Sequence, residues 1–191
     1  MSRKVVILKG SPRPKGNSAF LADTVAKAAQ EAGAEVTSFY LHGMNIHPCN
    51  HCDACQKRKT ICVVPDDMRE IFPKLIEADA IVLASPIYWF TFTAQLKTCI
   101  DRWYSLQGEP GDKLKGKEVG ILITYGDSDP YTSGAINAFH TFESMFCYLR
   151  CKMVGMVYGT AMDIGDIEKQ PALLTRAAQL GTRLGRGELP T

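Results

Sequence analysis

The sequence predicts an α/β fold, with a five-stranded parallel sheet in the doubly wound order 2-1-3-4-5 and helices on both faces. Two observations support this prediction. Five short runs are apolar and rich in β-branched residues, which is typical of strands that are buried on both faces. Helical patterns separate these runs, and alternation of strands and helices with right-handed crossovers produces a parallel sheet.

The expected elements follow one another along the chain in a regular order. The strands are expected at residues 4–9, 35–41, 80–85, 118–124 and 152–158. The helices are expected at 18–32, 66–77, 93–106, 132–149 and 167–184. Cys99, Cys147 and Cys151 fall within these elements and are predicted to be buried apolar side chains. Residues 1–191 are interpreted as a single domain, with a cysteine-rich insertion at about 42–65.

The loop after the first strand suits a bound anion. Residues 9–18 read Lys-Gly-Ser-Pro-Arg-Pro-Lys-Gly-Asn-Ser and lead directly into a helix. The first turn of a helix has unpaired N–H groups and a dipole that favours negative charge. An arginine fork and short polar side chains suit phosphate oxygens, which makes candidates of Ser11, Arg13, Asn17 and Ser18. The alternative is an ordinary turn that Asn17 caps. The loop lacks the Walker pattern and a full GxGxxG, which argues against a nucleotide triphosphatase and a dinucleotide site.

The loops after the third and fourth strands are expected to meet this first loop, because ligands bind where the winding of such a sheet reverses. The third strand ends in three consecutive aromatic residues on a proline-stiffened turn, which suits a flat ring system. The fourth ends near a glycine where a planar ligand could approach the backbone. Packing alone and a plain glycine turn are the alternatives. The ring-binding candidates are Pro86, Ile87, Tyr88, Trp89, Phe90, Thr124, Tyr125 and Gly126.

Together these motifs resemble the NAD(P)H-dependent FMN reductases of the flavodoxin-like superfold, a three-layer sandwich. The resemblance lies in Ser11-Pro12-Arg13 with Gly16-Asn17-Ser18, in Ser85-Pro86-Ile87-Tyr88 with the Gln95-Leu96-Lys97 and Ile100-Asp101-Arg102 that follow, and in residues 117–126. It implies that the first loop holds the phosphate of FMN and that the other two loops hold the isoalloxazine. It also implies NAD(P)H as co-substrate and a flavin, quinone, small organic or protein acceptor. The flavin would supply the chemistry, so no protein acid or base is assigned.

The inserted segment carries four closely spaced cysteines, Cys49, Cys52, Cys55 and Cys62. Their spacing resembles that of the iron-sulfur flavoproteins, a branch of the same superfold in which a 4Fe-4S cluster lies near FMN. This resemblance implies that the four cysteines are cluster ligands. It also implies an alternative function, an electron-transfer protein that receives electrons from ferredoxin. Three other interpretations stay open: cysteines without a metal, a redox disulfide, and zinc with His47 or His51 as one ligand.

Composition restricts the partners of this 191-residue chain. The formal net charge of +2 gives no electrostatic reason to expect nucleic acid or a membrane surface. The sequence shows no signal peptide and no apolar run near the ~20 residues that span a bilayer, so a cytoplasmic location is expected. Seven cysteines without a secretion signal favour metal or redox chemistry over a disulfide framework. The family resemblance implies a homodimer or homotetramer.

Overall fold

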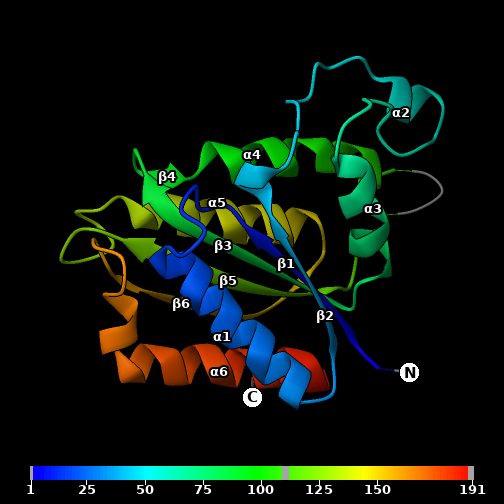
Figure 1. Ribbon diagram of the computed structural model, residues 1–191. Helices are drawn as coiled ribbons and strands as arrows, with labels where there is room; N and C mark the ends of the chain where they lie inside the picture. The colour runs from blue at the N-terminus through cyan, green and yellow to red at the C-terminus, as the bar shows by residue number, and fades with distance from the viewer. Residues whose placement is uncertain (1, 109–111, 189–191) are drawn as a thin grey trace.

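A central sheet lies between two layers of helices in the computed structural model, which describes residues 2–108 and 112–188 (Figure 1). The parallel strands occur in the order β2-β1-β3-β5-β6. Their bounds are β1 Lys4–Lys9, β2 Glu35–Tyr40, β3 Ala80–Tyr88, β5 Glu118–Tyr125 and β6 Lys152–Thr160. The short strand β4, Thr91–Phe92, pairs antiparallel with the end of β3. Apart from this addition the order is the predicted 2-1-3-4-5, and the flavodoxin-like fold class is confirmed.

Each expected helix is present, and two of them are divided. The α-helices are α1 Asn17–Glu31, α2 Ala54–Lys57, α3 Met68–Glu77, α4 Ala94–Asp101, α5 Ala135–Tyr148 and α6 Pro171–Arg186. Short 3-10 turns occur at η1 Leu41–Gly43, η2 Arg102–Leu106 and η3 Ile167–Lys169. The last expected helix is divided because Pro171 begins α6, where a missing N–H is tolerated. No helix in the described ranges has both the length and the apolarity to cross a bilayer.

The two faces of the sheet bury separate apolar cores. Helices α1 and α6 cover one face, and α3, α4 and α5 cover the other (Figure 1). Side chains alternate between these cores along each strand, so that Ile7 contributes to one and Leu8 to the other. Cys99 is buried as expected, but Cys147 is exposed and the prediction for it was wrong. The inward face of α5 is formed by Phe139, Phe142 and Phe146, and helical periodicity turns the next position outward.

The register of the sheet brings three loops to one edge. Lys9 of β1 lies beside Ala84 of β3, and Pro86 lies beside Thr124 of β5. The strands are parallel, so their carboxyl ends meet at this edge, and the loops that follow β1, β3 and β5 therefore surround one place.

Candidate functional site

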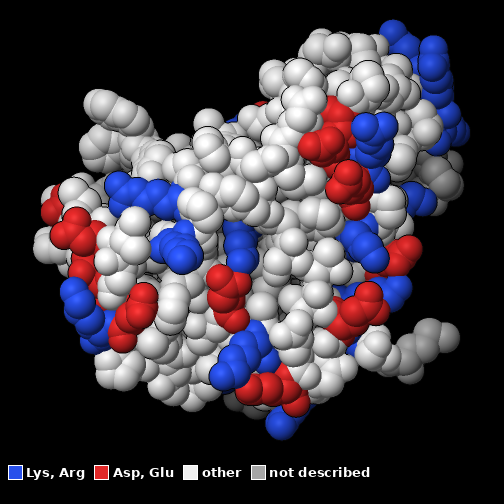
Figure 2. Space-filling view, viewed as in Figure 1, with Lys and Arg blue, Asp and Glu red and all other residues white. Residues whose placement is uncertain are grey.

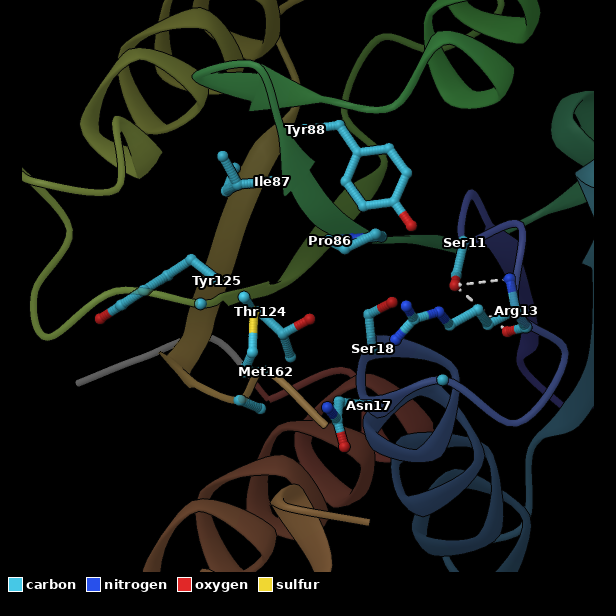
Figure 3. Close-up of a pocket in the computed structure, with 13 residues that line it drawn as sticks. Ser11, Arg13, Asn17, Ser18, Pro86, Ile87, Tyr88, Thr124, Tyr125 and Met162 are labelled. Carbon is cyan, nitrogen blue, oxygen red and sulfur yellow. Dashed lines mark hydrogen bonds between the residues drawn. The ribbon is translucent and has the colours of Figure 1, made fainter. Parts of the chain in front are cut away.

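A cleft opens at this edge, and it is lined by the residues that the sequence singled out together with a few others (Figure 3). The cleft and the open solvent at its mouth together make up about 510 Å³. All the predicted phosphate and ring residues line it except Trp89 and Phe90. The full lining is Ser11, Arg13, Gly16, Asn17, Ser18, Pro86, Ile87, Tyr88, Thr124, Tyr125, Gly126, Ala161 and Met162.

One end of the cleft is the N-terminus of α1. Gly16 occupies the N-cap position, and in the described part of the chain no side chain caps this helix. The hydroxyl of Ser11 accepts a hydrogen bond from the backbone N–H of Arg13 at 3.0 Å, which tightens the loop. A Cβ at Gly16 would lie 2.9 Å from the same hydroxyl oxygen, so a glycine is needed for this close turn. The guanidinium of Arg13 extends across the cleft mouth toward Ser18 (Figure 3).

Asn17 lines the cleft, and its side chain also makes structural hydrogen bonds. Its side-chain nitrogen donates to the carbonyl of Asp163 at 2.8 Å, and its side-chain oxygen accepts from the N–H of Ile167 at 3.3 Å. The amide therefore fastens the loop after β6 to the start of α1. Its own helix gains no cap from it, so the alternative of a turn capped by Asn17 does not describe this structure.

Thr93 joins the first two loops of the cleft. Its buried hydroxyl donates to the carbonyl of Gly10 at 2.7 Å. Its backbone N–H donates to the hydroxyl of Ser85 at 3.0 Å, and the N–H of Gly10 donates to the carbonyl of Ala84 at 2.8 Å. The same threonine hydroxyl accepts from Leu96 and so caps α4. The bonds of Thr93, together with the one between Gly10 and Ala84, hold the loop after β1 against the end of β3.

Sequence reasoning missed the loop after β6. Ala161 and Met162 line the cleft although no candidate was named there. A Cβ at Gly126 would lie 2.6 Å from the sulfur of Met162, so the thioether fills the space beside this glycine. The expected open approach to Gly126 is therefore covered by Met162. The rule that strand ends share one edge applies equally to β6, and it was the signal that could have found these residues.

Trp89 and Phe90 lie outside the cleft, at the tip of the β3–β4 hairpin. They line an adjoining hollow, which shares Ile87, Tyr125, Gly126 and Met162 with the cleft. The aromatic run is therefore divided: Tyr88 lines the cleft, and Phe90 lines its neighbour. Trp89 lines that neighbour too and, with Tyr88, a further hollow beside Thr91 and Phe92.

The four segment cysteines do not form a metal-binding group in the described part of the chain. Cys49 and Cys52 are exposed, Cys55 is buried in α2, and Cys62 is partly buried. All of them are free thiols. Within residues 2–108 and 112–188, no group of three or more His, Cys, Asp or Glu side chains could hold a metal ion. As placed here, the cysteines do not fit a cluster or a zinc site.

A buried ion pair ties this segment to the domain. The Arg102 guanidinium in η2 is hydrogen-bonded to the Asp66 carboxylate, and neither side chain is exposed. Arg102 also donates to the carbonyl of His47 at 2.8 Å and to the sulfur of Cys62 at 3.2 Å. Asp66 accepts from the N–H of His47 at 2.9 Å and from that of Met68 at 3.1 Å. Burial alone would raise the pKa of Asp66, but these hydrogen bonds outweigh it and hold that pKa below its ordinary value.

Comparison with known proteins now decides the family. A model of the family "NADPH-dependent FMN reductase" matches residues 3–160. The chain belongs to this family. The resemblance inferred from the loop motifs is confirmed, and so is the prediction of an oxidoreductase.

Individual relatives extend this result over nearly the whole chain. An iron-sulfur flavoprotein of Archaeoglobus fulgidus is 38% identical over 187 residues, which are 95% of this chain and 78% of that protein. An NAD(P)H:quinone oxidoreductase from Methanothermobacter marburgensis has a similar fold, with a TM-score of 0.73, 20% identity and coverage of 96% and 98% of the two chains. An FMN-dependent NADH-azoreductase from Bacillus anthracis, solved in complex with FMN, has a TM-score of 0.72 at 14% identity and covers 96% and 99% of the two chains.

The substitution Thr93→Val tests the joint between the loops. It keeps the shape but leaves the buried Gly10 carbonyl without its donor, so the free energy of unfolding should fall by about 1–3 kcal/mol. Urea unfolding measures this. Thr141→Val is the matched control, because that exposed hydroxyl also donates to a carbonyl and its loss should cost less than about 0.5 kcal/mol. Equal losses in the two variants would contradict the assigned role.

Asp66→Asn tests the anchor of the cysteine segment. Removing the charge leaves Arg102 buried and unpaired, which should cost about 3–5 kcal/mol in the free energy of unfolding. The folded pKa of Asp66 is depressed, so its stabilisation is present above the unfolded value of about 3.9 and is lost as pH falls through the folded pKa. The difference between the wild type and the variant should therefore shrink in acid. Asp101→Asn removes an exposed ion pair with Lys97 and serves as the control, with a loss of at most about 1 kcal/mol.

Proposed function

We propose that this chain oxidises NAD(P)H with an FMN held in the cleft and passes the electrons to an acceptor. The observation that carries the proposal is one continuous cleft with an anion-binding helix N-terminus at one end and apolar walls at the other. Each turnover removes a hydride, which is two electrons and one proton, from NAD(P)H. A quinone-type acceptor takes up two electrons and two protons, the second proton coming from solvent.

The polar end of the cleft suits the phosphate of FMN. The backbone N–H groups at the start of α1 and the hydroxyl of Ser18 are the neutral donors, and Arg13 adds a positive charge. The hydroxyl of Ser11 donates to the carbonyl of Arg13 at 3.1 Å and would have to turn away from it to reach a phosphate. Within the described ranges, no carboxylate lines the cleft. Because the side-chain amide of Asn17 is already bonded, its contribution would come from its backbone N–H. An anion at this end therefore meets N–H and O–H donors and a positive charge.

The other end of the cleft suits a flat ring. Pro86, Ile87 and Tyr88 form one wall, and the stretch from Thr124 to Gly126 forms the other. A ring that reached the backbone of Gly126 would displace the Met162 side chain, which is exposed and unbranched and therefore adaptable. Bound FMN would supply hydride acceptance and electron transfer. The protein binds and orients it, and no side chain in the cleft is assigned as a proton donor or acceptor.

Arg13→Ala should weaken FMN binding by about 1.5–3 kcal/mol, the range for a hydrogen bond to a charged group. This corresponds to a dissociation constant roughly 10- to 150-fold higher. Quenching of FMN fluorescence during titration of the apoprotein measures it. Arg58→Ala, an equally exposed arginine in the cysteine segment, should leave FMN affinity unchanged. A wild-type protein that binds no FMN would remove the proposed function, whereas equal affinity in wild type and Arg13→Ala would remove only the role of Arg13.

A second candidate is an iron-sulfur flavoprotein that exchanges electrons with an acidic redox protein such as a ferredoxin. In addition to the cysteine spacing, one structural observation favours this candidate. Lys57, Arg58 and Lys59 are exposed around α2, next to Cys55, and basic side chains gather on this part of the molecule at the upper right of Figure 2. A positive surface beside the cysteines would attract an acidic partner. Assembly into a homodimer or homotetramer stays a prediction for both candidates.

Iron content separates the two candidates. If the cysteines bind a 4Fe-4S cluster, anaerobically purified protein should contain about four irons per chain. Cys52→Ala should then lose most of this iron, and the exposed Cys147→Ala should retain it. Background iron in the anaerobically prepared wild type would eliminate the second candidate and leave the first intact.

A further inference from the structure

The tip of the β3–β4 hairpin has an unusual backbone. Tyr88 pairs with Thr91, so Trp89 and Phe90 are the only two residues of the turn. Both have positive φ, 47° and 66°. Two-residue turns of this kind strongly prefer Asn-Gly, because L-residues with a Cβ are strained there. The chain instead places two large aromatic side chains at these positions, and such strain is concentrated at functional sites.

The turn is held in one position by α5. The side-chain nitrogen of Asn137 donates to the carbonyl of Phe90 at 3.3 Å. The Phe90 ring lies directly against Gly134, where a Cβ would come within 2.3 Å of a ring carbon. Gly134 itself has a φ of 72°, which suits a residue without a side chain. Phe90 is therefore fixed, whereas Trp89 is 92% exposed beside it.

The hollow beside these rings has its own chemical character. It opens directly beside the cleft and is lined by Ile87, Trp89, Phe90, Tyr125, Gly126, Asp127, Thr132, Ser133 and Met162. Among the described residues that line it there is no lysine or arginine, and Asp127 is the one charged residue. The neighbouring Asp129 accepts hydrogen bonds from the hydroxyl and N–H of Thr132 and the N–H of Tyr131, which lower its pKa to about 2, so it is charged at neutral pH. An anionic ligand would meet the carboxylate of Asp127 and no cation among these lining residues, with the charged Asp129 nearby in the chain.

We propose that this hollow binds an uncharged planar acceptor of the quinone class, with Trp89 and Phe90 as its stacking surface. The proposal rests on the proposed function, because it places the acceptor beside the ring end of the cleft. Aromatic faces bind flat rings by stacking. The carboxylate of Asp127, with Asp129 nearby, favours an uncharged ring over a sulfonated or phosphorylated ring of the same size.

Equilibrium dialysis of the FMN-loaded protein, without NAD(P)H, tests this. The probes are hydroxymethylanthraquinone and anthraquinone monosulfonate, which share a ring system and differ in charge. The wild type should bind the neutral ring more tightly. Trp89→Ala should raise its dissociation constant about threefold to tenfold, the range of aromatic stacking. Trp89→Phe should restore most of the affinity. Asp127→Asn should reduce the difference in affinity between the neutral and the sulfonated probe.

Tyr148→Ala is the matched control, since that tyrosine is 73% exposed and lines neither the cleft nor the hollow. It should bind both probes as the wild type does. A fluorescence titration adds a second measurement: Trp103 is 2% exposed, so quenching by the neutral ring reports on Trp89. Equal affinity of Trp89→Ala and Tyr148→Ala for the neutral ring would overturn the proposal.

The variant Trp89→Gly distinguishes a ligand-binding role of Trp89 from a structural role in the turn. Glycine relieves the positive φ and no packing is lost, so the melting temperature should rise while affinity for the neutral ring falls. A lower melting temperature with unchanged affinity would overturn the proposal. The proposal would also be overturned if the wild type were a dimer, and Trp89→Ala were a monomer that binds the neutral ring as tightly as the wild type does. Trp89 would then bind a second copy of the chain. FMN affinity is measured in each variant, and loss of FMN binding in the wild type would count against the proposed function instead.

Discussion

The hydrogen bond from the Thr93 hydroxyl to the Gly10 carbonyl is the contact on which the geometry of the site depends. The loop after β1 supplies the polar end of the cleft, and the end of β3 supplies one apolar wall. These two segments are far apart in the chain and meet where the paired strands β1 and β3 end. Thr93 joins them in a buried place, where a carbonyl without a donor would be costly. The separation between the polar and apolar ends is thereby fixed before any ligand binds, which lowers the cost of ordering on binding.

Charge divides the site into two regions although the whole chain is nearly neutral. The cleft combines a helix N-terminus with Arg13 and contains no carboxylate. The adjoining hollow contains Asp127 and no basic residue. A phosphate is therefore drawn to one region and an uncharged ring is tolerated in the other. The boundary between them is formed by the residues that line both, Ile87, Tyr125, Gly126 and Met162.

The fold could be predicted from the sequence because β-branched runs and helical periods are local signals. The cleft followed from topology, since residues after β1, β3 and β5 must meet at one edge. What could not be predicted depends on contacts between distant residues. Asp66 suggested only a helix cap, since nothing in the sequence indicates that Arg102 lies buried against it. The aromatic run gave no sign that a strained turn would divide it between two hollows.

Helix α4 connects the cleft to the cysteine segment. Its capping residue, Thr93, belongs to the joint between the loops, and Arg102 follows immediately after its last residue and holds Cys62. Nine residues at the rise of an α-helix separate these two points by about 14 Å. Both ends of this spacer are buried and hydrogen-bonded, so a shift at one end requires breaking contacts at the other. The sulfur of Cys62 therefore has a fixed place relative to the cleft, whereas Cys49 and Cys52 lie exposed on a segment with positive φ at His51 and Asp53. Among the four cysteines, Cys62 is bonded directly to this framework through Arg102, and Cys55 is held near it because the neighbouring Gln56 donates to the carbonyl of Tyr104 at 2.7 Å.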